Sequence, residues 1–205
     1  MLMEGFEFSR EAIADGEWWR LVGAAFAHLS WAHFAGNLAL LCVVLVLLQP
    51  VATPRAAVGV FFACTFATTG GLWFGSTLDW YAGASGPIYG LLFWGAARLP
   101  APLGPGLLLG VVLVVLADQG RMQTWLGEPL APAAHYWGLA GGMTVVLAGA
   151  LSDHLRERLR QRGIARDRGA HDCRQPSGLQ PSAAAQDALG SVDAAGHAIE
   201  VGVHR

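Results

Sequence analysis

The sequence predicts an all-α protein, a polytopic bundle of membrane helices. Of its 205 residues 54% are hydrophobic and only 14% are charged, whereas a soluble domain is about 25% charged. All 13 basic residues are arginine, and within residues 20–151 there are only four of them: Arg20, Arg55, Arg98 and Arg121. Apolar runs therefore fill this part of the chain, as expected for helices that cross a lipid bilayer.

Five apolar runs approach the ~20 residues that a spanning helix needs. In chain order they cover residues 31–48, 56–74, 85–97, 103–117 and 133–151. The third and fourth runs are short for a full span, so they need flanking residues or local thinning of the bilayer. We expect five transmembrane helices within a core of residues 18–151, preceded by an external segment, 1–17, and followed by a polar tail, 152–205.

The arginines predict the orientation of these helices. Arg55 follows the first run, Arg98 the third, and a basic cluster that starts at Arg156 follows the fifth. With five crossings, all three places lie on one side, which the positive-inside rule makes cytoplasmic. The first, third and fifth runs then begin at the outer face. The tail 152–205 has no aromatic residue, so we expect it to be disordered and cytoplasmic.

Composition also excludes several function classes. The net charge of −2 argues against a nucleic-acid partner. Cys42, Cys64 and Cys173 are scattered without metal or disulfide spacing, so no metal or cofactor is expected. The use of arginine without lysine, beside abundant Ala, Gly and Leu, indicates a GC-rich bacterial genome, and the inner membrane is the expected location.

Polar residues interrupt the outer end of the first run, "AFAHLSWAHFAGNLALL", in the pattern H-x4-H-x3-N. His33 and Asn37 are four residues apart and share a helix face, so both can donate to one developing negative charge, with His28 preceding them. Polar groups inside a membrane are costly and indicate function. The alternative is that they only form hydrogen bonds between helices.

The third run begins at "YAGASGPIYG". Gly83 and its neighbours permit a tight turn, and Ser85 falls at the helix N-terminus, where free N–H groups favour an anion. Tyr89 lies four residues later on the same face. A serine at this position is also explained by simple N-capping.

The fifth run opens with "APAAHYWGLAGGM" and contains His135. Small residues recur at four-residue steps on both runs: Gly86 and Gly90, then Ala134, Gly138 and Gly142. Such faces let membrane helices approach closely, which would bring His135 within hydrogen-bond reach of Ser85. Serine needs a base at that distance to act as a nucleophile. Alone, His135 is equally explained as an interfacial histidine.

Taken together, these motifs resemble the rhomboid family of intramembrane serine proteases. That family has H-x4-H-x3-N on its second helix, G-x-S-G at the start of its fourth and A-H-x-x-G on its sixth, and a Trp-Arg pair that Trp19 and Arg20 match. The resemblance covers about residues 18–151. Within that family the chain resembles the rhombosortase subfamily, and this resemblance implies substrates that carry a C-terminal Gly-Gly, an apolar helix and a basic tail.

The resemblance implies a role for each site residue. Ser85 attacks the scissile bond of a transmembrane protein substrate, and His135 takes its proton. The donors to the oxyanion are Asn37, His33 and the backbone N–H of Ser85. Tyr89 positions the histidine ring, while Gly83 and His28 support the site. No third triad member is implied, and we interpret two acids in the outer loop, Asp118 and Glu128, as interface residues.

Rhomboids also have a helix before the Trp-Arg pair, and this sequence begins too late to hold it. Two explanations are open: the true start lies upstream of Met1, or the core has five helices. The oligomeric state is left open. Two other readings remain: a catalytically silent rhomboid-like protein that binds membrane helices, and a small transporter or channel subunit. The first would usually lack the serine or the histidine. The second needs polar residues along a path across the bilayer, whereas here they cluster at one face.

Overall fold

The computed structural model describes residues 3–119 and 131–172, and for residues 163–172 only the backbone. The chain divides into two compact units, Met1–Asp153 and His154–Arg205. The described elements run in this order: β1 (Phe8–Ser9), α1 (Arg10–Ala14), α2 (Arg20–Gly23), α3 (Trp31–Leu48), α4 (Pro54–Gly75), β2 (Trp80–Tyr81), α5 (Ser85–Ala96), α6 (Leu103–Ala117) and α7 (Pro132–Asp172).

The helical fold class is confirmed, and α3 to α6 follow the expected runs closely. The end of the fifth helix differs, because α7 continues past residue 151 to Asp172, where we had expected a tail without structure. The Glu157 carboxylate accepts hydrogen bonds from Arg160 and Gln161, three and four residues ahead, and such pairs stabilise an exposed helix. Residues 173–205 lie outside the described residues.

Two of the described helices, α3 and α4, are long and apolar enough to cross a membrane by length and composition, and α6 is a shorter apolar helix. The sides of α3 and α6 that face away from the core are apolar. Val46 of α3 is 71% exposed and Leu116 of α6 is 61% exposed. Large apolar side chains in such positions are expected where a helix faces lipid rather than water.

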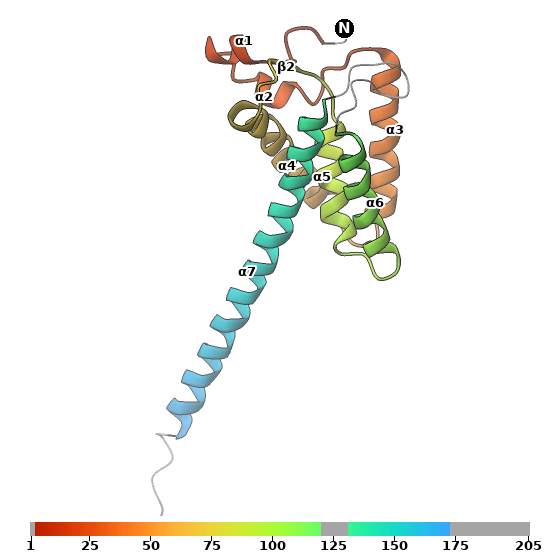
Figure 1. Ribbon diagram of the computed structural model, residues 1–205. Coiled ribbons are helices and arrows are strands. Elements are labelled where there is room, and N and C mark those ends of the chain that lie inside the picture. The colour runs from red at the N-terminus through yellow and green to blue at the C-terminus, as the bar shows by residue number, and fades with distance from the viewer. Residues whose placement is uncertain (1–2, 120–130, 173–205) are drawn as a thin grey trace, which may run out of the picture. The chain divides into compact units, whose positions relative to one another are not determined.

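Helix α5 occupies the centre of the first unit and packs against α3, α4 and α6 (Figure 1). Its Ile88, Leu91 and Trp94 are buried in one core with Val44 of α3 and Cys64 of α4. Burial on several sides fixes the position of α5, and therefore of the serine at its first residue.

Helices α5 and α7 touch backbone to backbone through glycine. A Cβ at Gly138 would clash with the carbonyl oxygen of Gly86, and a Cβ at Gly142 would clash with that of Gly90. This is the close approach that the small-residue spacing predicts. It brings the N-terminal turns of α5 and α7 to the same end of the first unit, where α3 also begins (Figure 1).

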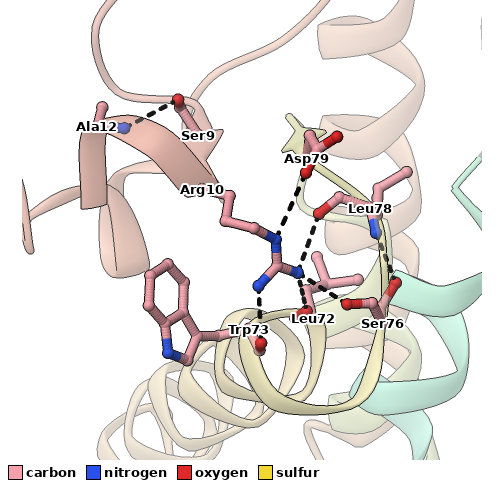
Figure 2. Close-up of polar contacts among 8 residues, drawn as sticks. All are labelled: Ser9, Arg10, Ala12, Leu72, Trp73, Ser76, Leu78 and Asp79. Atoms are coloured by element: carbon pink, nitrogen blue, oxygen red, sulfur yellow. Dashed lines mark hydrogen bonds and ion pairs between the residues drawn. The ribbon is translucent and has the colours of Figure 1, made fainter. Parts of the chain in front are cut away.

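The N-terminal segment holds the loop that leads into α5. β1 pairs antiparallel with β2, so that Phe8 lies opposite Tyr81. Figure 2 shows the Arg10 guanidinium directed at the C-terminal end of α4, where it donates to the carbonyl oxygens of Leu72, Trp73 and Ser76, each at 2.8 Å. The last carbonyls of a helix have no partner within it, so Arg10 caps α4 and fixes the chain that follows.

Candidate active site

Ser85 is the first residue of α5, and the turn before it depends on glycine. Gly83 has a φ of +138°, which L side chains rarely adopt. Its N–H donates to the carbonyl of Ala24 at 2.9 Å, and its carbonyl accepts from the hydroxyl of Tyr81 at 2.6 Å. Burial raises the pKa of Tyr81, so this hydroxyl keeps the proton that it donates.

The Ser85 side chain does not cap the helix. The N-cap of α5 is Ala84, and no side chain makes a cap hydrogen bond there. Instead, Ser85 Oγ lies 2.8 Å from Nε2 of His135. The capping explanation that the sequence left open is therefore wrong for this serine, because its hydroxyl is directed at another helix.

His135 lies in the first turn of α7 and is only 5% exposed. The ring of Tyr89 meets the imidazole edge to face, with centroids 4.9 Å apart and planes at 69°. Ser85, Tyr89 and His135 are thus brought together as the spacing predicted, by the glycine contact between α5 and α7.

His33 and Asn37 reach the same place from α3. An ideal Cβ on Gly83 would lie 3.1 Å from Nε2 of His33 and 3.7 Å from Nδ2 of Asn37, so both side chains lie over the turn that leads into Ser85. Asn37 is 7% exposed, and its Nδ2 has no hydrogen-bond partner among the described residues. A buried amide donor without a partner is costly, and it is available to a negative charge.

The surroundings of His33 fix which ring nitrogen carries its proton. The N–H of Leu29 donates to Nδ1 of His33 at 3.4 Å, so in the neutral ring the proton is on Nε2. Ser30 caps α3 by accepting from the backbone N–H of His33, which anchors this residue in the first turn. Nε2 of His33, the nitrogen near Gly83, is then a donor.

His28 supports His33 rather than lining the turn itself. Its ring lies 5.2 Å from the ring of His33 and 5.3 Å from that of Phe34, centroid to centroid, with an edge-to-face arrangement in both pairs. Its Nδ1 donates to the carbonyl of Phe26 at 2.9 Å. The supporting role of His28, which the resemblance implies, stays a prediction.

The sequence reasoning missed one neighbour of His135. Asp118 directly follows α6, and its Oδ2 lies 2.9 Å from Nδ1 of His135. We had interpreted it as an interface residue, but its side chain is only 14% exposed. The available signal was an acid at the end of an apolar helix, on the same side as the other polar clusters. Glu128, the other acid, lies outside the described residues.

Arg20 of the Trp-Arg pair lies apart from these residues. It pairs with Glu17 at 2.6 Å and with Glu7 at 3.1 Å, and it donates to the backbone carbonyl of Glu7. It therefore joins α2 to the N-terminal segment. Trp19 is 54% exposed, as expected for a residue at a membrane interface.

The assembled parts are a hydroxyl, an imidazole within hydrogen-bond distance and two nearby donors, which is the set needed for acyl transfer. A scan against protein-family models matches residues 15–151 to the rhomboid domain. This chain belongs to the rhomboid family. No match was found among curated proteins. Rhomboid proteins are generally intramembrane serine proteases that act on transmembrane substrates, so this rhomboid is an integral membrane protein.

Proposed function

We propose that this rhomboid is an active intramembrane serine endopeptidase with Ser85 as nucleophile and His135 as general base. The observation that carries the proposal is the 2.8 Å separation of Ser85 Oγ and His135 Nε2. A serine becomes nucleophilic when a base at this distance accepts its proton. The proposed oxyanion site consists of Asn37, His33 and the backbone N–H of Ser85.

The reaction proceeds in two halves. Ser85 Oγ adds to the scissile carbonyl carbon while its proton passes to His135 Nε2, and the carbonyl electron pair moves onto oxygen. Collapse of this intermediate breaks the C–N bond, and the amine leaves with the proton from Nε2. Water then adds to the acyl carbon and gives a proton to Nε2. The ester bond then breaks as Nε2 returns its proton to Ser85 Oγ, which releases the new carboxyl terminus and restores both Ser85 and His135.

The proposed substrates are C-terminal sorting tails with a Gly-Gly sequence, an apolar helix and a basic end, as the resemblance to rhombosortases implies. A helix hides its carbonyls in hydrogen bonds, and glycine favours unwinding. A Gly-Gly segment is therefore a suitable place to expose the scissile bond.

The proposed setting is a bacterial inner membrane, crossed five times, with the C-terminus in the cytoplasm. It is supported by Arg55 and Arg98, which follow α3 and α5, and by the arginines from Arg156 onward, which follow the apolar part of α7. The site lies at the end where α3, α5 and α7 begin, so in this orientation cleavage takes place near the outer membrane face.

The alternative function is a catalytically silent rhomboid that binds membrane helices without cutting them. A protein that only binds helices does not need a buried imidazole that faces a serine hydroxyl at the N-terminus of α5. Proteolysis is therefore the function that the geometry favours.

The test is co-expression with a reporter that ends in Gly-Gly, an apolar helix and a basic tail. We expect the wild type to release the reporter and Ser85→Ala and His135→Ala to leave it intact. Cys42→Ala, an exposed change on α3, is the matched control and should cut normally. Equal processing by the wild type and both site variants would disprove the proposal. Cleavage of a different helix, with the reporter intact, would remove only the sorting assignment.

A further inference from the structure

A third side chain adjoins the proposed pair of Ser85 and His135. Asp118 Oδ2 lies 2.9 Å from Nδ1 of His135, while Nε2 of the same ring lies 2.8 Å from Ser85 Oγ. The side chains of Asp118 and His135 are 14% and 6% exposed. Hydroxyl, imidazole and carboxylate thus form one continuous chain of hydrogen bonds from α5 through α7 to the end of α6.

We propose that Asp118 is a positioning residue of this protease, a third member beside Ser85 and His135; the inference rests on the proposed function. Its basis is the identity of the donors. An ionised carboxylate only accepts hydrogen bonds, so Nδ1 of His135 carries the proton in this contact. In the neutral ring Nε2 is then unprotonated, and it is the atom that faces the Ser85 hydroxyl.

Asp118 also stabilises the charge that forms during the reaction. When His135 accepts the serine proton, the ring becomes a cation in a largely buried place, and a buried charge is costly unless it is paired. The adjacent carboxylate supplies the opposite charge. The proton moves only between Ser85 Oγ, His135 Nε2 and the leaving nitrogen, as in soluble serine proteases with a triad.

A purely structural tie between α6 and α7 explains the geometry less well. In the part of the chain that the structure describes, the hydrogen-bond partner of the Asp118 carboxylate is His135 and not an arginine. An acid with only an interfacial role would be more stable in contact with water. Burial of its charge costs several kcal/mol, which is about as much as pairing with a neighbour returns. The ring that it contacts is also the one that faces the nucleophile.

The first experiment compares Asp118→Asn with Gln119→Ala in purified, reconstituted enzyme. Gln119 is the adjacent residue, and its amide donates to the carbonyl of Val115 on α6. Gln119→Ala therefore removes a hydrogen bond at the end of the helix without removing the contact to His135. We expect Asp118→Asn to lower kcat by about 10²- to 10⁴-fold with little change in KM, as loss of an oriented base does. Asp118→Glu, which keeps the carboxylate, should recover part of the rate.

The second experiment does not need activity. It uses Ser85→Ala protein labelled with ¹⁵N-histidine. The His135 signals are those that disappear when His135→Gln is added to the same protein. We expect a protonated Nδ1 and an unprotonated Nε2, with this preference lost when Asp118→Asn is added. The NMR result therefore decides the role of Asp118 toward the ring even if no variant cleaves a substrate, in which case only the proposed function has failed.

Two results would overturn the inference. One is wild-type kcat in Asp118→Asn, or a loss of kcat that Gln119→Ala reproduces in full. The other is an unprotonated Nδ1 in the presence of Asp118. Thermal denaturation of each variant separates misfolding from loss of positioning. If Asp118→Asn fails to fold, Asp118→Glu and the ¹⁵N measurement on folded Ser85→Ala protein still decide the question.

Discussion

At the scale of single residues, the most informative position is Asn37, whose amide nitrogen is buried without a partner among the described residues. A group of this kind lowers stability in the resting protein. It is retained at little net cost only if it gains a partner during function. The oxyanion of the proposed reaction is such a partner, because the Asn37 amide lies over Gly83, two residues before the nucleophile.

We therefore predict opposite effects of Asn37→Leu on rate and on stability. Loss of one oxyanion donor should lower kcat by about 10²- to 10³-fold. Replacement of an unsatisfied amide by an apolar group of similar shape should leave the denaturation midpoint unchanged or raise it. The rate is measured in detergent with the reporter substrate, and the denaturation midpoint is measured in the same detergent. A lowered midpoint with normal kcat would instead make Asn37 a hydrogen-bonding contact between helices.

At the scale of elements, much of the candidate site could be predicted from the sequence because the relevant signals are local. The spacing of His33 and Asn37 places them on one helix face, and the glycines around Gly86 and Gly138 permit close helix contact. Asp118 could not be found in the same way. Its partner His135 lies 17 residues further along the chain, on α7, and no periodicity links the end of one helix to the start of the next.

The extension of α7 was missed for a different reason. Polar composition beyond residue 151 indicates only that a segment has no core of its own. It does not exclude a helix that continues from an anchored one and is stabilised by pairs along its surface, such as Glu157 with Arg160.

The glycine contact between α5 and α7 yields a prediction at the element scale. Gly138→Ala places a methyl group against the backbone of Gly86, so the helices must separate and Ser85 must move away from His135. We expect at least a ~10-fold loss of kcat and a destabilisation of about 1–3 kcal/mol. Activity assays and thermal denaturation measure the two effects.

The matched control is Gly149→Ala on the same helix, where an added Cβ meets only the Arg98 side chain at an ordinary 3.7 Å. This change should be neutral or slightly stabilising, because alanine favours helix more than glycine does. Equal behaviour of the two variants would show that the contact between α5 and α7 does not position the site.

At the scale of the whole first unit, the N-terminal segment is joined to the helical core by buried charge. Glu7 and Arg20 side chains are 17% and 11% exposed and lie 3.1 Å apart. Arg20 belongs to α2, which is bound to α4 by the hydrogen bond from the Thr69 hydroxyl to the carbonyl of Leu21. The turn that precedes Ser85 receives its support from this same end of the molecule, through β1 and Arg10.

This arrangement predicts how the stability of the protein responds to acid. Burial raises the pKa of Glu7, but hydrogen bonds from its own backbone, Arg20 and the Gly5 N–H outweigh burial, so the pKa lies below its ordinary 4.5. A depressed carboxyl pKa contributes stability above the unfolded value, and that stability is lost as the pH falls through the folded value. The stabilising contribution of Glu7 should therefore be complete at pH 7, begin to fall near pH 4.5 and be lost as the pH falls through the lower pKa of the folded state.

The comparison that isolates this contribution is Glu7→Gln against Asp15→Asn, an exposed acid in the same segment. At pH 7 we expect Glu7→Gln to lower the denaturation midpoint in detergent by about 2–5 °C, and Asp15→Asn to change it little. As the pH falls below 4.5 and through the lower folded pKa of Glu7, the gap between wild type and Glu7→Gln should close, because the wild-type carboxyl then takes up its proton. A gap that persists in acid would assign the effect to packing of the side chain rather than to its charge.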